Sequence, residues 1–201
     1  KETEAIYRKV FTRFEKYVSM IGKFSSELIL NLKKIEDYSN GLDIMASNLN
    51  ISSEKKQEIL EISNVRDRGY RILDEIVAEM EIASLEKTIE SFKTKSSKNI
   101  EFVLEREKVI NGLEKEIIDY LVPLSDKNLS DDEQHKVFVM MYAINDYERI
   151  GDHCENIIEL IQEIKEENSV FSKTAFDEYE KISSDVMKII VDTTNAYKDN
   201  N

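Results

Sequence analysis

The stretch that decides the fold is residues 143–158, which read AINDYERIGDHCENII. From Ile144 to Ile158 its apolar residues recur at intervals of three and four, as they do on one face of an α-helix. Upstream, Ser130-Asp131-Asp132-Glu133 has the pattern of a capping box, which begins a helix. We therefore predict one long helix from residue 131 to about residue 166.

The rest of the chain repeats this periodicity. Apolar residues spaced by three or four predict further helices at about 2–48, 52–92, 98–121 and 173–197, and Pro123 is expected to end the third of the five. Within the first of them, the cluster Ser39-Asn40-Gly41 is a candidate for a break or kink. No segment alternates with a period of two, and the chain has only five Gly and one Pro, so β-hairpins are not expected. The sequence predicts an all-α protein, an antiparallel bundle whose helices bury their apolar stripes on one another.

The composition excludes several classes of function. The 201 residues include 41 Asp and Glu against 28 Lys and Arg, a net charge of −13, which repels nucleic acid. The longest apolar run, residues 137–144, is far shorter than the roughly 20 residues of a membrane-spanning helix, and no signal peptide is visible. A single cysteine, Cys154, fits a reducing compartment, so we expect a cytoplasmic protein.

Residues that would support catalysis are scarce. His135 and His153 are the only imidazoles, Cys154 lies on the apolar stripe, and there is no phosphate-binding Gly loop or zinc-type cluster. We therefore expect a protein that is not an enzyme.

An acidic row beside the apolar stripe of the 131–166 helix is the best candidate site. Glu148 and Asp152 are four residues apart and project from the same side, and Asn145, Glu155 and Glu159 extend the row. Carboxylate and amide oxygens in a row can bind a hard cation, but such a row is also common on a solvated face. Gly151 lies within it, and a mid-helix Gly costs about 1 kcal/mol relative to Ala, which suggests close approach of a neighbouring helix.

The preceding helix carries a similar row. Glu107, Asn111 and Glu114 lie on one side of it, so the two rows face a common groove if the helices are antiparallel neighbours, or they face water. Around the row of the later helix, Asn145, Arg149 and His153 are polar candidates for contacts with a partner.

Two stretches together resemble the PhoU domain family. They are INDYERIGDHCENI at 144–157 and EREKVINGLEKEI at 105–117, and the likeness extends over about residues 64–197. Within the family, the nearest resemblance is to the cytoplasmic PhoU-like part of bacterial sodium/phosphate cotransporters. The resemblance implies a PhoU-like three-helix bundle at 63–168, a helix at 169–201 like the start of a second bundle, and an N-terminal helical segment at 1–62 without an assigned role.

The resemblance also implies a function. PhoU proteins bind metal clusters, often iron or zinc, through Glu/Asp-x-x-x-Asp motifs. Glu148 and Asp152 match that motif, and Glu107 with Asn111 occupies the equivalent place on the preceding helix. The implied role is a non-catalytic regulatory module that contacts a phosphate transporter's membrane domain, on the same or a separate chain, at the inner face of the cell membrane. A purely structural interaction module, a metal-binding bundle unrelated to transport, and self-association into a homo-oligomer remain open.

Overall fold

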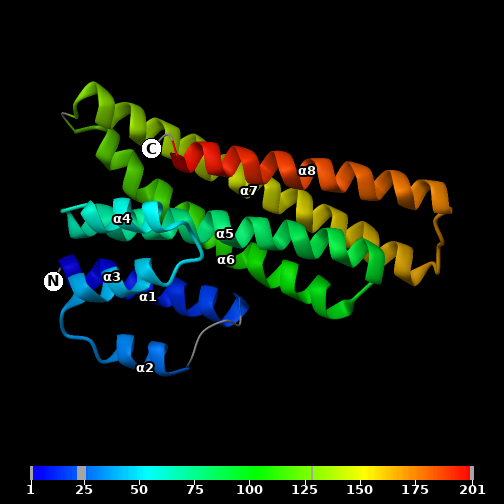
Figure 1. The fold of residues 1–201 in the computed structure, drawn as a ribbon, viewed down its shortest axis with the longest axis horizontal. Coiled ribbons are helices and arrows are strands. Elements are labelled where there is room, and N and C mark those ends of the chain that lie inside the picture. Colours follow the sequence, from blue (N-terminus) through cyan, green and yellow to red (C-terminus); the bar gives the residue numbers. More distant parts are fainter. Residues whose placement is uncertain (1, 22–25, 128, 200–201) are drawn as a thin grey trace. The chain divides into compact units, whose positions relative to one another are not determined.

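The computed structural model describes residues 2–21, 26–127 and 129–199, and every regular element in these ranges is an α-helix (Figure 1). This confirms the predicted all-α class. The eight described helices are α1 (Glu2–Ile21), α2 (Ser26–Lys33), α3 (Tyr38–Ser47), α4 (Ser53–Glu61), α5 (Val65–Thr94), α6 (Ser97–Ser125), α7 (Asp131–Glu166) and α8 (Lys173–Asp199).

The chain divides into two compact units, which we call unit 1 (Lys1–Glu79) and unit 2 (Met80–Asn201). The division lies inside α5, so the first half of this helix belongs to unit 1 and its second half to unit 2. The boundaries predicted from the sequence lie between helices, 62/63 between α4 and α5 and 168/169 between α7 and α8, and they stay predictions.

Unit 1 is held together by the apolar faces of short helices. The α1 side chains Phe14 and Tyr17 are fully buried, as are Met45 of α3 and Ile72 of α5. The Tyr7 hydroxyl donates a hydrogen bond to the Leu32 carbonyl at 2.6 Å, which ties α1 to α2. These contacts give unit 1 an apolar core of its own.

Two of the predicted long helices are interrupted in unit 1, so the prediction that each is one helix was wrong; the candidate break at 39–41 lies inside α3, just after the actual interruption. The expected helix at 2–48 is three helices, and α3 begins where the Asp37 side chain accepts a hydrogen bond from the Asn40 amide. The expected helix at 52–92 is α4 and α5, because Asn64 Oδ1 accepts a hydrogen bond from the Arg66 amide and so starts a new helix. Short polar side chains that cap a helix favour a new start over continuation.

Pro123 does not end its helix as predicted, because α6 continues through Ser125. Proline removes one backbone donor, and its ring disfavours helical geometry at the preceding residue. The position is only two residues from the helix end, where few backbone bonds remain to be lost, and the Ser125 hydroxyl donates to the Val122 carbonyl at 2.7 Å. The disruption is therefore confined to the last turn.

Unit 2 contains the second half of α5 together with α6, α7 and α8. One hydrophobic cluster of its core consists of Leu85, Ile100, Val103, Cys154, Ile158 and Ile161. The Phe92 ring of α5 stacks on Tyr179 of α8, with ring centroids 3.7 Å apart. The capping box that the sequence predicted is formed at the start of α7, with Ser130 and Glu133 as its members.

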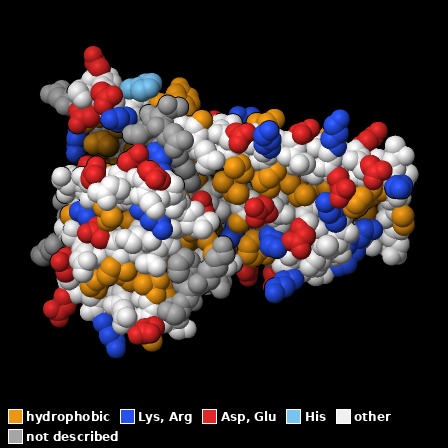
Figure 2. Space-filling view, in the orientation of Figure 1, with side chains coloured by type: hydrophobic (Ala, Val, Ile, Leu, Met, Phe, Trp, Pro, Cys, Tyr) orange, Lys and Arg blue, Asp and Glu red, His pale blue; other side chains and the backbone are white. Residues whose placement is uncertain are grey.

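The surface of unit 2 carries large exposed hydrophobic side chains on α8, and hydrophobic side chains gather in this region of the space-filling view (Figure 2). In the described part of the chain, no helix is both long enough and apolar enough to cross a membrane.

Candidate functional site: a carboxylate cluster around Gly151

Gly151 is the point at which three helices of unit 2 bring carboxylates together. A Cβ atom at this position would meet Glu107 Oε2 of α6, and it would lie 2.9 Å from Glu81 Oε1 of α5. The absence of a side chain on α7 therefore leaves room for acidic side chains from both neighbours. The close approach that the sequence suggested is made by carboxylates, and this accounts for a glycine in the middle of a long helix.

Three acidic side chains at this point lie close enough together to hold one metal ion. One carboxylate oxygen each from Glu107, Asp152 and Glu155 lies within 4.8 Å of the other two. Glu107 is buried, Glu155 is half-buried and Asp152 is exposed, so the group extends from the core of unit 2 to its surface. An ion at this position would have a path to solvent through Asp152.

Glu81 adds a fourth carboxylate from a third helix. Its side chain is completely buried, and within the described chain neither of its carboxylate oxygens has a hydrogen-bond partner. Leaving a buried ionised group without partners is among the most expensive arrangements in a protein, and such groups are usually paired, protonated or bound to metal. Glu81 faces the same point above Gly151 as Glu107 does.

A buried arginine lies close to these acids but is engaged elsewhere. Arg106 of α6 is fully buried, and its guanidinium donates a 2.6 Å hydrogen bond to the Met80 carbonyl. The same guanidinium lies over the Phe102 ring, 4.2 Å from the centroid. Its positive charge favours ionised Glu81, but burial and the charge of Glu107 outweigh it and raise the pKa of Glu81 well above its usual value.

The other carboxyls of the cluster share this electrostatic environment. Burial, and then the charges of Asp152 and Glu155, raise the pKa of Glu107 to about 7, although a hydrogen bond from the Asn111 side chain opposes the change. Burial and the Asp152 charge also raise the pKa of Glu148. Mutual repulsion of this kind is relieved when a proton or a cation occupies the cluster.

The predicted site residues have the following places in the structure. Glu107 and Asp152 belong to the three-carboxylate group, and Asn111 lies next to it as a hydrogen-bond partner of Glu107. Glu148 is half-buried and outside the group, but its charge acts on both Glu81 and Glu107.

The candidate contact residues lie on the outer face of α7. Asn145, Arg149 and His153 are all exposed, and the Arg149 guanidinium lies 3.7 Å from the Asp146 carboxylate in a solvent-exposed pair. They stay predictions as partner contacts.

Sequence reasoning did not select Glu81, and it noted Glu155 only as an extension of the acidic row. The signal for Glu81 was weak: it is a single acidic residue directly after Met80, in a stretch that was interpreted as an ordinary amphipathic helix. Its role depends on α5 packing beside α6 and α7, which periodicity alone does not reveal.

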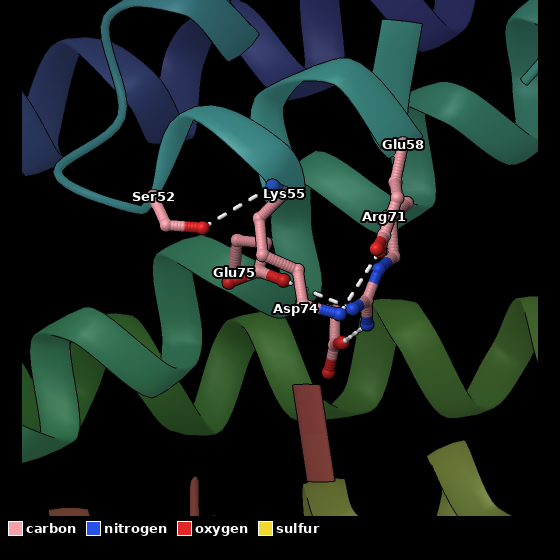
Figure 3. Close-up of polar contacts among 6 residues, drawn as sticks. All are labelled: Ser52, Lys55, Glu58, Arg71, Asp74 and Glu75. Carbon is pink, nitrogen blue, oxygen red and sulfur yellow. Dashed lines mark hydrogen bonds and ion pairs between the residues drawn. The ribbon is translucent and has the colours of Figure 1, made fainter. Parts of the chain in front are cut away.

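A second charged cluster, in unit 1, contains buried acids that are paired with basic side chains (Figure 3). Glu75 of α5 is fully buried, like Glu81, but its Oε1 lies 3.0 Å from the Arg71 guanidinium, which also pairs with Asp74. The nearly buried Lys55 pairs with Glu58 at 2.9 Å. Each of these acids is paired with a cation of the chain itself, so we interpret this cluster as structural.

Comparison with known protein families finds a match to a different domain family in each part of the chain. Residues 75–161 match the PhoU domain, which agrees with the resemblance seen in the sequence. Residues 1–78 match the ATP-dependent protease La (LON) substrate-binding domain, a likeness that the sequence reading did not find. The two matches meet in α5, near the division between the units.

Curated relatives are named Lon protease. One from Fusobacterium nucleatum is 93% identical over 99 residues, which are 49% of this chain and 13% of the relative. Relatives from Clostridioides difficile and Bacillus thuringiensis are 38% and 36% identical over 88 residues, 44% of this chain and 11% of each relative. The chain thus spans about an eighth or less of their length, and no solved structure matches it.

Proposed function

We propose that unit 2 is a non-catalytic, PhoU-like accessory module of phosphate transport that binds a cation in the carboxylate cluster. The observation that carries the cation site is Glu81, a fully buried carboxylate without a hydrogen-bond partner in the described chain, directed at the Glu107–Asp152–Glu155 group. The match of residues 75–161 to the PhoU domain supports the assignment of the module.

The donor set fits an oxygen-preferring cation. All four carboxylates offer oxygen only, and the buried thiol of Cys154 is held protonated because burial raises its pKa to about 12. Carboxylate oxygens suit hard ions, and carboxylate-bridged iron sites occur in helical bundles, whereas structural zinc prefers nitrogen and sulfur. Of the two metals that the resemblance implies, the donor set favours iron over zinc. The bound ion would supply positive charge that neutralises the buried acids and fixes α5, α6 and α7 together.

The regulatory role would be exerted through protein contact. The chain carries a net charge of −13, so unit 2 is not suited to binding free phosphate or anionic lipid directly. The exposed Asn145, Arg149 and His153 lie on the same helix as the cluster and are suited to touch a partner. That partner, in this proposal, is the membrane domain of a phosphate transporter, specifically a sodium/phosphate cotransporter, contacted from the cytoplasm at the inner face of the membrane.

Metal binding is tested by titrating the chelator-treated protein with Fe²⁺, Zn²⁺ and Mn²⁺ in a calorimeter. We expect Glu107→Gln and Glu81→Gln each to weaken binding about 10-fold or more, since each removes one anionic ligand. Glu163→Gln, an exposed acid on α7, is the matched control and should bind as the wild type does. Equal affinities in all four proteins would refute the cluster as the site.

The transport role needs a separate test. We expect the protein to co-purify with a phosphate transporter, and Glu148→Arg with Asp152→Arg to abolish this contact while helicity is kept. Phosphate uptake that is unchanged after deletion of the module would contradict the role. Metal binding without transporter contact would indicate a metal-binding bundle unrelated to transport. If the variants changed neither metal binding nor transporter contact, the motif would only pack within the bundle, as in a purely structural interaction module.

A second candidate function belongs to unit 1. The match of residues 1–78 to the LON substrate-binding domain favours a role in contacting polypeptides, and 99 residues of the chain, 49% of it, are 93% identical to a Lon protease. Cross-linking of the protein to an unfolded model polypeptide should give adducts that map to residues 1–79. Adducts only in residues 80–201 would contradict it.

A further inference from the structure

We propose that α8 is a self-association surface, through which two copies of the chain pair with their α8 helices antiparallel. The proposal depends on an exposed apolar stripe that lies beside a row of alternating basic and acidic residues. When two such rows run antiparallel, each basic residue of one row lies near an acidic residue of the other. It lies in unit 2 but does not use the carboxylate cluster, so it stands apart from the proposed function.

The apolar stripe consists of Ile182, Val186 and Ile189. They are spaced by four and three residues, so they lie within about 60° of one another around the helix. Ile182 and Ile189 are each 63% exposed and Val186 is 40% exposed. The inner face of the same helix, which includes Tyr179, Ser183 and Thr194, packs within unit 2, so the stripe is a second and separate face.

The stripe continues onto α7. A groove between α7 and α8 is lined by Tyr142 and Ile150 from one helix and by Ile190 and Thr193 from the other. The Tyr142 side chain is 71% exposed. A helix laid against the stripe would therefore also cover an aromatic side chain, a kind of residue that is enriched in interfaces.

The charged row runs along one flank of the stripe. It is Lys181, Asp185, Lys188 and Asp192, all exposed, and Figure 2 shows acidic and basic side chains alternating along this edge of α8. Spacings of four, three and four keep the row on one side of the helix.

These charges do not pair with one another along the helix, although their spacing would allow it. Among the described residues no ion pair or hydrogen bond involves the side chains of Lys181, Asp185, Lys188 or Asp192. The row is thus free to pair outside the chain.

A second copy is the occupant that this pattern fits. A two-fold axis perpendicular to α8 brings the same flank of both helices together. The register that sets Val186 against Ile189 of the second copy also sets Lys181 near Asp192 and Asp185 near Lys188. The offset along the axis is then two residues, about 3 Å, which a lysine side chain spans easily.

Each of these pairs occurs twice by symmetry, which gives four attractive pairs. A parallel pair would bring different flanks together, so the row would not meet its complement. Self-complementarity of this kind is what an isologous dimer interface requires.

The test exchanges charges between copies. Variant A carries Lys181→Asp and Lys188→Asp, so its row is wholly acidic, and variant B carries Asp185→Lys and Asp192→Lys, so its row is wholly basic. Sedimentation equilibrium should show that the wild type forms a dimer and that A and B each dissociate with a constant raised about tenfold or more, because four attractive pairs become repulsive. An equimolar mixture of A and B should restore the dimer as a heterodimer, which also shows that both variants are folded.

The control is Lys115→Asp with Lys127→Asp, which changes the net charge by the same amount as variant A at exposed positions outside α8. It should associate as the wild type does. A monomeric wild type at high micromolar concentration would overturn the proposal, as would homodimers of A and B as strong as the wild type, or an A and B mixture that stays monomeric.

Discussion

At the scale of single residues, Gly151 determines whether the carboxylate cluster can form. Replacing it with Ala gains about 1 kcal/mol of helix propensity, but it drives a methyl group into Glu107 and Glu81. We expect Gly151→Ala to lower the free energy of unfolding by about 1–3 kcal/mol in urea denaturation, because overpacking a buried site outweighs the propensity gain. A variant more stable than the wild type would contradict the geometry.

The contact itself can be isolated by a double-mutant cycle. Glu107→Ala removes the side chain that the new methyl group would meet. The double variant should therefore lose less stability than the two single changes added together. Strict additivity would show that Gly151 and Glu107 do not meet.

Glu107 also makes the stability of the cation-free protein depend on pH. Its pKa is about 7 in the folded chain against an ordinary value of 4.5. Between these values the folded state holds a proton that the unfolded chain has released, so the free energy of unfolding falls as the pH rises through this window. With chelator present, the free energy of unfolding should fall between pH 5 and pH 7.5 by roughly 1–3 kcal/mol more in the wild type than in Glu107→Gln. The same slope in both proteins would contradict the assignment.

Part of this site could be predicted from the sequence and part could not. Glu107 and Asp152 were found because helical spacing places them on two rows, and Gly151 was identified as unusual because propensity alone disfavours it. Glu81 was missed because no neighbouring residue in the sequence indicates that it belongs to a carboxylate cluster. Its burial arises only when α5 packs beside α6 and α7, a tertiary effect that one-dimensional periodicity does not contain.

At the scale of elements, α7 shows how a local sequence signal fixes a helix start. Ser130 Oγ accepts a hydrogen bond from the Glu133 amide, and the Glu133 carboxylate accepts one from the Ser130 amide at 2.8 Å. We expect Ser130→Ala to lower the free energy of unfolding by about 1 kcal/mol in thermal or urea denaturation.

The control for this change is Ser184→Ala, at an exposed position inside α8. Serine has no capping role there, and alanine is the better helix former, so stability should be unchanged or slightly raised. If both variants lost stability equally, the effect could not be ascribed to the cap.

The start of a helix was predicted well where a full capping box marks it, and poorly where a single capping residue does. The start of α7 agrees with the sequence because its capping box is unambiguous. The start of α5 was missed, and the break before α3 was placed a few residues too late, because single residues, Asn64 and Asp37, create these starts inside a continuous apolar pattern. Pro123 was given too much weight because a proline near the last turn removes little.

At the scale of the whole molecule, the chain is two units with separate cores that share one helix. Phe14 is fully buried in unit 1, and truncating such a side chain costs about 3–5 kcal/mol. We expect Phe14→Ala to lower the melting temperature of unit 1 but, well below that temperature, to leave cation affinity in calorimetric titration unchanged. A parallel loss of affinity would show that the carboxylate cluster depends on the unit 1 core.

The buried thiol of Cys154 has a practical consequence. It is 1% exposed, and burial keeps its pKa near 12, so maleimides and iodoacetamide meet neither an accessible sulfur nor a thiolate while the core of unit 2 is closed. The rate at which this sulfur is alkylated therefore measures how often that core opens. Added iron should lower this alkylation rate, which mass spectrometry of the one modified peptide would measure.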